Sequence, residues 1–258
     1  MITFENRDCM EAMRDFPDKF FDLAIVDPPY GDGGGVFRNR FGGMFQSSIT
    51  HGEINTRQVR GDRKQIREVQ ADCQYVEYHG GGVSRKTISR TGGTWASKYA
   101  KKIIAWDIAP PREYFEELFR ISRNQIIFGG NYFDLPPTRC FIVFRKTNIP
   151  IKGFTMAPVE YAWTSFTENA KIYEHFTQSA GKEKRFHPTQ KPIGLYKDCL
   201  ADFAKAGDKI LDTHVGSGSS LIACYDMGFD VWGYEIDEIY YKLAQERIAD
   251  FTAQMRMF

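Results

Sequence analysis

The stretch KILDTHVGSGSS, residues 209–220, decides the fold class of this chain. It starts as a short apolar run, reaches Asp212, and continues into a turn that contains Gly216 and Gly218. A helix is predicted directly after this turn, and the next apolar run ends at Glu235. A strand, a glycine-rich turn, a helix and a strand that ends on a carboxylate form a βαβ unit suited to a nucleoside cofactor.

Each polar position of this unit has a chemical use. Gly216 and Gly218 let the backbone approach a ligand closely at a helix N-terminus. The Glu235 carboxylate can accept both ribose hydroxyls, and Asp212 can bind an ammonium group or an ordered water molecule. The pattern leaves a dinucleotide and S-adenosylmethionine open, although Leu221 stands where a dinucleotide fingerprint has its third glycine. A tight turn without a ligand is the structural alternative.

The same alternation of apolar runs and amphipathic stretches extends over the chain. It predicts an α/β fold with a mostly parallel, doubly wound sheet and helices on both faces. Strands are expected at Met1–Phe4, Phe21–Val26, Gln125–Phe128, Phe141–Phe144, Glu160–Phe166, Lys209–Leu211 and Val231–Tyr234. Helices are expected at Asp8–Phe16, from Pro111, at Ile193–Ala206, at Ser219–Met227 and from Asp237.

Residues 31–105 interrupt this pattern. They hold 13 of the 23 glycines and a clear excess of lysine and arginine over acidic residues. We expect an insertion or loop outside the central sheet, whose basic side chains contact phosphate groups; a solvated loop is the alternative. The predicted domains are therefore a core of residues 1–30 and 106–258 and an insertion of residues 31–105.

Composition excludes several classes of protein. A chain of 258 residues with 42% hydrophobic residues can bury a substantial core. No apolar run is long enough to span a membrane, and the N-terminus lacks the pattern of a secretory signal. The five cysteines are scattered without a Cys-x-x-Cys pair, which predicts neither a disulfide framework nor a metal site and favours a cytoplasmic location.

A second motif, Asp27-Pro28-Pro29-Tyr30, directly follows the apolar run Phe21–Val26. The two prolines fix the backbone and remove N–H donors, so that carbonyl groups stay free to accept hydrogen bonds. An exocyclic amino group needs two acceptors for its hydrogens, and a purine needs a surface on which to stack. Asp27, the Pro28 carbonyl and Tyr30 meet these needs, whereas a proline-rich turn is the alternative.

A third motif, His187-Pro-Thr-Gln-Lys-Pro192, precedes the helix expected from Ile193. The Thr189 hydroxyl and the Lys191 ammonium group can hold a carboxylate such as that of a methionine moiety. A polar turn with proline at a helix start accounts for the same residues.

Together the three motifs resemble the β class of amino-DNA methyltransferases, the adenine-N6 and cytosine-N4 DNA methylase family. In that class Asp-Pro-Pro-Tyr lies near the N-terminus, and His-x-Thr-x-Lys-Pro precedes an Asp-Pro-Phe-x-Gly-Ser-Gly loop, a circularly permuted motif order. The resemblance covers residues 1–30 and about 106–250. One departure is His214, in Asp212-Thr213-His214, where the family usually has Asp-Pro-Phe.

The resemblance implies a role for each matching residue. Asp27, Pro28, Pro29 and Tyr30 would form the catalytic motif that holds the target base. S-adenosylmethionine would be the cofactor, and its predicted contacts are Asp8, Thr189, Lys191, Asp212, Gly216, Ser217, Gly218 and Glu235.

The resemblance also implies a reaction. We expect a bacterial or phage-encoded enzyme of restriction–modification that flips a base out of double-stranded DNA and methylates adenine N6. The segment 31–105 would contact DNA and part of the recognition sequence. Cytosine-N4 methylation is the nearest alternative and RNA methylation a weaker one; an NAD-dependent oxidoreductase and a non-catalytic DNA-binding protein are alternatives of other classes. The oligomeric state stays open, with a homodimer among the alternatives.

Overall fold

The computed structural model describes residues 1–31, 75–79, 82–86, 108–151, 157–177 and 185–255. The chain divides into two compact units, Met1–Tyr30 with Ala109–Phe258, and Gly31–Ile108. Within the second unit, strands β3 (Tyr75–His79) and β4 (Gly82–Lys86) form an antiparallel hairpin. This hairpin is a sheet of its own, so it adds no strand to the sheet of the first unit.

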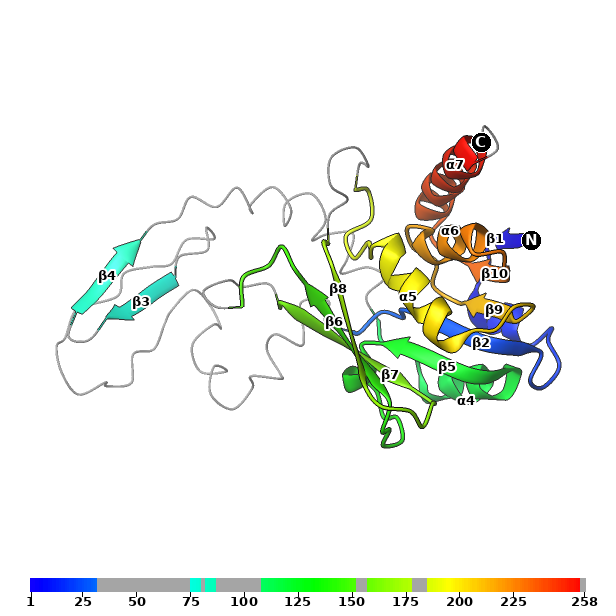
Figure 1. Ribbon diagram of the computed structural model, residues 1–258, viewed down its shortest axis with the longest axis horizontal. Coiled ribbons are helices and arrows are strands. Elements are labelled where there is room, and N and C mark those ends of the chain that lie inside the picture. The colour runs from blue at the N-terminus through cyan, green and yellow to red at the C-terminus, as the bar shows by residue number, and fades with distance from the viewer. Residues whose placement is uncertain (32–74, 80–81, 87–107, 152–156, 178–184, 256–258) are drawn as a thin grey trace. The chain divides into compact units, whose positions relative to one another are not determined.

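The first unit is built on one eight-stranded sheet with the order β1-β10-β9-β2-β5-β7-β6-β8 (Figure 1). The strands β1, β10, β9, β2 and β5 are parallel, whereas β7 runs antiparallel to its neighbours β5 and β6. The expected α/β fold with a mostly parallel sheet is thus confirmed. The strands are β1 (Ile2–Glu5), β2 (Phe21–Val26), β5 (Ser122–Phe128), β6 (Phe141–Lys146), β7 (Val159–Thr164), β8 (Lys171–His175), β9 (Lys209–Asp212) and β10 (Asp230–Tyr234).

Helices cover both faces of this sheet. Buried residues of α1 and α4 belong to one hydrophobic cluster, and buried residues of α5 and α6 belong to the other. The helices of the first unit are α1 (Cys9–Met13), α4 (Arg112–Ile121), α5 (Ile193–Phe203), α6 (Ser219–Asp226) and α7 (Glu238–Met255), with a 3₁₀ turn at Gly130–Tyr132. The two clusters on opposite faces are what a doubly wound sheet requires.

Strand β2 shows why its sequence is apolar from Leu23 to Val26. Leu23 and Ile25 belong to the cluster under α5 and α6, while Ala24 and Val26 belong to the cluster under α1 and α4. Because successive side chains of a strand point to opposite faces, a strand covered on both sides needs apolar residues at consecutive positions. The one polar residue of β2, Asp22, lies near its start and is only partly buried.

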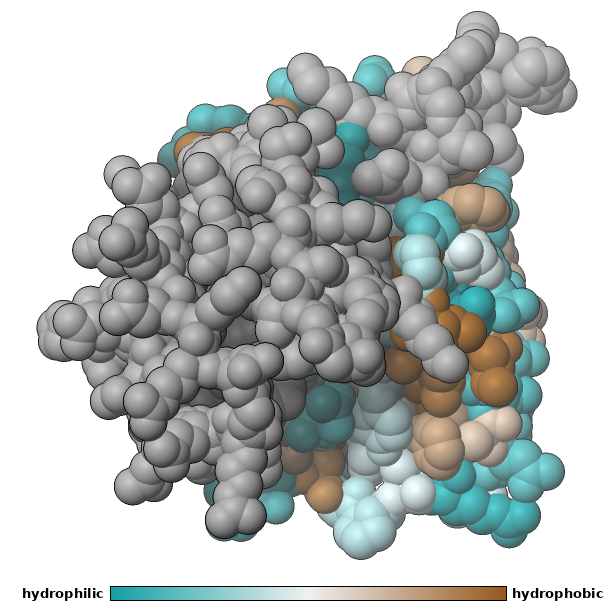
Figure 2. Space-filling model, turned by 90° about the vertical axis from the view of Figure 1, so that its left-hand side faces the viewer, coloured by the Kyte–Doolittle hydropathy of each residue, from teal (hydrophilic) through white to brown (hydrophobic). Residues whose placement is uncertain are grey.

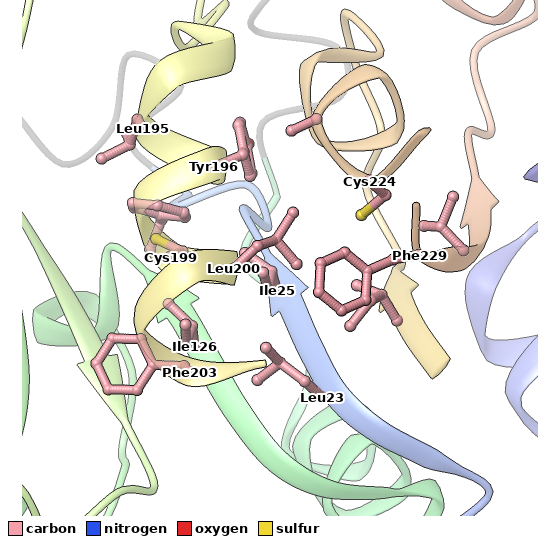
Figure 3. Packing of buried hydrophobic residues seen from close by; sticks show 14 of the residues in the cluster. Leu23, Ile25, Ile126, Leu195, Tyr196, Cys199, Leu200, Phe203, Cys224 and Phe229 are labelled. Carbon is pink, nitrogen blue, oxygen red and sulfur yellow. The ribbon is translucent and has the colours of Figure 1, made fainter. Parts of the chain in front are cut away.

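Helix α5 packs against the centre of the sheet. Leu200 and Phe203 of this helix lie over Leu23 and Ile25 of β2 and Ile126 of β5 (Figure 3). Burying a large aliphatic or aromatic side chain contributes about 1.5–3 kcal/mol. This packing holds the N-terminal end of α5, and with it the segment that ends at Pro192, at a fixed place on the sheet.

Besides the hairpin of β3 and β4, the structure adds one strand, in the first unit, that the sequence pattern did not predict. Strand β8 (KIYEH) is an edge strand in which only Tyr173 is buried, so it lacks the apolar run that marks a central strand. Three helices are also shorter than expected, and α6 ends at Asp226 rather than Met227. Helix α1 ends at Met13 rather than near Phe16, and α5 ends at Phe203 rather than Ala206.

Among the described residues, no helix is long and apolar enough to cross a membrane, and no group of three or more potential metal ligands occurs. Some large apolar side chains are exposed in that part of the chain, among them Ile172 and Phe176. The coloured residues in Figure 2 show hydrophobic patches interspersed with hydrophilic residues.

Three acidic residues share one edge of the sheet. Asp27 follows β2, Asp212 ends β9, and Glu235 follows β10. Strand β9 pairs in parallel with both β2 and β10, so the carboxyl ends of all three strands lie at the same edge. The expected adjacency of the strands that lead to Asp27 and Asp212 is confirmed, and this edge is where open α/β sheets bind ligands.

Candidate active site

The Asp27–Tyr30 motif presents a buried carboxylate at the end of β2. The Asp27 side chain is 13% exposed, and its two oxygens accept hydrogen bonds from different partners. The Tyr30 hydroxyl donates to Oδ1 at 2.7 Å, and the Lys191 ammonium group donates to Oδ2. Burial and the nearby Asp27 carboxylate raise the pKa of Tyr30 far above its ordinary value, so this phenol remains a donor at neutral pH.

The Tyr30 ring lies in an aromatic group that depends on a glycine. It stacks on Tyr132 with centroids 4.7 Å apart and an interplanar angle of 8°. Gly129 has a φ of +67°, and a Cβ at this position would lie 2.2 Å from Tyr30 Cε1. Glycine is therefore required for its positive φ and for the close approach of the tyrosine ring.

The turn after β9 holds Asp212 with neutral donors. Its Oδ1 accepts from the backbone N–H of His214 at 2.9 Å, and its Oδ2 accepts from the Ser220 hydroxyl. Burial raises the pKa of Asp212 to about 7, against the opposing effect of these two donors. Gly216 and Gly218 both adopt positive φ, +54° and +80°, as the tight turn requires.

Glu235 is tied to the same turn. Its Oε2 accepts from the backbone N–H of Gly216 at 2.8 Å, and its Oε1 accepts from the N–H of Asp237 at 2.9 Å. Burial raises the pKa of Glu235, while these backbone donors oppose the shift. The amide of Asn6 donates to the Glu235 carbonyl at 2.7 Å, which brings the end of β1 to the end of β10.

The His187–Pro192 segment contacts the turn through its backbone. The Ser219 hydroxyl donates to the Lys191 carbonyl at 2.7 Å. Thr189 is exposed, and its hydroxyl lies 3.2 Å from His187 Nδ1. Burial, with the nearby Lys191, lowers the pKa of His187 to about 3, so the ring is neutral and packs edge-on against Tyr240.

Asp8 and His214 lie beside the cofactor-binding candidates. Asp8 is the N-cap of α1, and its Oδ1 accepts from the N–H of Met10 at 2.8 Å. Burial lowers the pKa of His214 to about 4, and its neutral ring contacts Tyr114 edge-on and the Thr213 hydroxyl at 2.9 Å. His214 thus packs as a neutral aromatic residue at the position where phenylalanine is usual.

Sequence reasoning missed three charged residues at the site. Glu160 of β7 lies 3.5 Å from Lys191 Nζ, and Lys146 of β6 forms an ion pair with Glu160. Arg247 of α7 donates to the Ser217 carbonyl at 2.7 Å and to the Ser219 hydroxyl at 2.9 Å. Glu160 and Lys146 could have been noticed because each is a charged residue in a strand of a largely buried sheet. Nothing in the local sequence marks Arg247.

The fold and the acidic strand ends define a class of α/β proteins that bind ligands at the carboxyl edge of the sheet. A sequence model described as DNA methylase matches residues 21–246. The chain therefore belongs to the adenine-N6/cytosine-N4 DNA methylase family, and it is a methyltransferase that uses S-adenosylmethionine. This membership overturns the oxidoreductase alternative.

Curated relatives agree with this assignment. The type II methyltransferase M2.DpnII of Streptococcus pneumoniae is 37% identical over 237 residues, which cover 88% of this chain and 82% of that protein. The type II methyltransferase M2.MboI of Moraxella bovis is 22% identical over 268 residues, 96% of this chain and 88% of that protein.

Solved structures share the fold. The M1.HpyAVI complex with SAM matches with a TM-score of 0.50 and 17% identity, over 96% of this chain and 99% of that one. The PvuII DNA methyltransferase, described as cytosine-N4-specific, matches with a TM-score of 0.51 and 10% identity, over 97% and 90% of the two chains.

The residues present fit S-adenosylmethionine. The cofactor carries positive charge at its sulfonium and ammonium groups, and Asp212 is a carboxyl that is 1% exposed and has only neutral donors among its described contacts. The turn has no room for larger residues, since a Cβ on Gly216 would lie 3.2 Å from His187 Cε1. Asp212, Gly216, Ser217, Gly218 and Glu235 come together in this turn, while Thr189 and Asp8 lie at its margins.

Proposed function

We propose that this methyltransferase modifies the N6 amino group of adenine in double-stranded DNA. The observation that carries the proposal is the Asp27 carboxylate, held at the end of β2 by Tyr30 and Lys191 on the sheet edge shared with Asp212. Aspartate at this position is typical of the adenine enzymes of the family, whereas the cytosine enzymes more often have serine.

The motif supplies what an extruded base needs. Asp27 and the Pro28 carbonyl are the acceptors for the two amino hydrogens, and the Tyr30–Tyr132 pair offers aromatic surface for stacking. Bound S-adenosylmethionine supplies an electrophilic methyl group. Asp27 orients the amino nitrogen toward that group and holds the proton which the nitrogen releases. Positioning of this kind contributes up to about 7–11 kcal/mol when alignment is ideal.

Product analysis tests the choice of base. DNA methylated by the purified enzyme is digested to nucleosides and examined by mass spectrometry. The proposal predicts N6-methyladenine as the product. Because the PvuII enzyme with the same fold is described as cytosine-N4-specific, N4-methylcytosine is the product that would overturn the assignment.

The role of Asp27 is tested by Asp27→Ala. This variant should bind S-adenosylmethionine with unchanged affinity and lose methyl transfer, because the cofactor contacts lie on other strands. Calorimetry with the cofactor and transfer of a radioactive methyl group to DNA measure the two effects. Normal methylation by this variant would contradict the proposed role.

We also propose that residues 31–105 contact DNA phosphates and part of the recognition sequence. The support is the excess of lysine and arginine in this segment, most of which lies outside the described residues. Phosphate contacts release counterions, so affinity for DNA should fall steeply as salt increases. Binding measured by fluorescence anisotropy that is independent of salt would argue against this role.

A further inference from the structure

Four charged side chains, of which Glu160 is the most exposed at 27%, form one largely buried group beside the proposed base-binding motif. The Lys191 ammonium group bonds to Asp27 Oδ2 and lies 3.5 Å from Glu160 Oε2, and Lys146 pairs with Glu160 Oε1. The side chains of Lys191 and Lys146 are only 5% and 10% exposed. They come from separate parts of the chain: the loop after β2, the segment before α5, and strands β7 and β6.

The two central groups, Lys191 and Glu160, are stabilised in their charged forms. Burial disfavours charge on Lys191, but Asp27 and Glu160 outweigh it and raise the pKa of the ammonium group. Burial likewise disfavours charge on Glu160, but Lys191 and Lys146 outweigh it and lower the pKa of the carboxyl. Two ammonium groups and two carboxylates then balance.

Such a group is not explained by stability alone. Moving charges out of water carries a large desolvation penalty, and buried ion pairs are often no more stabilising than apolar residues of similar size. Moreover, the Glu160 Oε2 atom is buried and has no hydrogen-bond partner among the described residues. The longer ion pair with Lys191, at 3.5 Å, is the contact that this oxygen makes within the described part of the chain. The arrangement fixes the place of an ammonium group beside Asp27.

We propose that Lys191 and Glu160 are positioning residues for Asp27, and that Lys191 acts on the base-binding motif instead of binding the cofactor carboxylate. Lys191 holds the Asp27 carboxylate in a fixed position through its ion pair, and Glu160 holds the Lys191 ammonium group in place. The inference rests on the proposed role of Asp27 in holding the target amino group.

The ammonium group and the backbone carbonyl of Lys191 contact different halves of the site. Its ammonium group is occupied by Asp27 and Glu160 and lies 4.8 Å from the centre of the Phe128 ring. Its carbonyl, in contrast, accepts from Ser219 at the start of α6, beside the cofactor turn. The side chain therefore serves the base half of the site, and the backbone joins this half to the cofactor half.

The first experiment compares Lys191→Met with Lys197→Met. Lys197 of α5 forms an ion pair with Asp226 away from the site, which makes it a matched control. Single-turnover methyl transfer is measured at saturating DNA and cofactor, alongside cofactor affinity by calorimetry and thermal unfolding. Lys191→Met should transfer about 100-fold more slowly, the loss expected for a misplaced reacting group. Its cofactor affinity should stay within about twofold, because its carbonyl contact is kept.

The opposite result would overturn the proposal. Lys191→Met could weaken cofactor binding about tenfold or more and still transfer methyl groups at the normal rate at saturating cofactor. Lys191 would then be a cofactor ligand, because it would contribute to binding and not to the transfer step. A normal rate with normal affinity would equally remove Lys191 from the site.

A second variant keeps the test decisive if Lys191→Met does not fold. Glu160→Gln preserves the size of the side chain and removes one charge. The control is Glu174→Gln, because Glu174 forms an ion pair with Arg145 on the same sheet. Glu160→Gln should transfer about tenfold more slowly at saturation with unchanged cofactor affinity. Because Glu160 acts through Lys191, the double variant should lose no more than Lys191→Met alone; additive losses would contradict the inference.

These outcomes are distinct from failure of the proposed function. Normal methylation by Asp27→Ala would remove the role of Asp27 and, with it, this inference. If Asp27→Ala is inactive while Lys191→Met and Glu160→Gln behave like their controls, the inference alone fails.

Discussion

Asp27 and Asp212 lie at the ends of neighbouring parallel strands, yet the protein surrounds their carboxyl groups differently. Asp27 contacts an ammonium group that is itself buried, together with a phenol. Asp212 contacts a serine hydroxyl and a backbone N–H, and no cation among the described residues bonds to it. One acid has its counter-charge built into the protein, while the other has only neutral donors.

The difference fits the ligands proposed for the two halves of the site. A neutral base amino group brings no charge, so a counter-ion for its carboxylate acceptor must come from the protein. The cofactor brings positive charge of its own, so a carboxyl whose pKa is raised to about 7 gains its counter-ion only on binding. The comparison predicts that changes at Asp27 affect the rate and that changes at Asp212 affect cofactor affinity.

The largest effect is expected from Asp27→Asn. The amide is similar in size but cannot carry the charge that accepts the amino hydrogens, so the single-turnover rate should fall about 1,000-fold. Cofactor affinity should be unchanged. If Asp27→Asn instead weakens cofactor binding and keeps the normal rate at saturating cofactor, Asp27 has the role assigned here to Asp212.

Asp212→Asn is the complementary change. Loss of a charged partner for the cofactor should weaken its binding about 10- to 100-fold, the range for a charged hydrogen bond. The rate at saturating cofactor should fall much less than in Asp27→Asn. Calorimetry and single-turnover kinetics on the same preparation separate the two effects, and equal losses of rate in both variants would break the comparison.

The pH dependence of cofactor binding is the next test. Because the pKa of Asp212 is raised to about 7, its carboxyl takes up a proton as pH falls through that value and stops attracting a cation. Affinity should therefore level off above about pH 8 and fall by up to about tenfold per unit well below pH 7. Titrations between pH 5.5 and 7.5 measure this. The pH dependence of cofactor affinity should be much weaker in Asp212→Asn. If it is unchanged in this variant, a group other than Asp212 causes it.

The smallest effect is expected from Ser220→Ala. This change removes one neutral donor from Asp212, which should make ionisation harder and weaken cofactor binding about fivefold at pH 7. The effect should fade as pH rises toward 8, where the carboxyl ionises without that donor. A loss that is the same at every pH would mean that Ser220 acts through packing.

Much of the fold followed from local sequence signals. The run Phe21–Val26 is strand β2 with the bounds expected, because its consecutive apolar residues Leu23–Val26 are typical of a strand buried on both faces. The turn with Gly216 and Gly218 was equally clear, since positive φ angles restrict the choice of residue. Strand β8 was missed because an edge strand needs few apolar residues.

The candidate site was predicted less completely. Asp27, Asp212 and Glu235 were found because each stands at a strand end, and parallel pairing brings such ends to one edge. Glu160 and Lys146 were not found, because they lie within strands whose contacts with Lys191 depend on the antiparallel pairing of β6 and β7.

By itself, the sequence determined the alternation of strands and helices, the two acidic motifs and the family resemblance. These depend on short-range periodicity and on residues a few positions apart. Only the tertiary structure decided where the Lys191 side chain goes. Its contact with Asp27 joins residues 164 positions apart. No local sequence pattern specifies which distant carboxylate a flexible lysine side chain will contact.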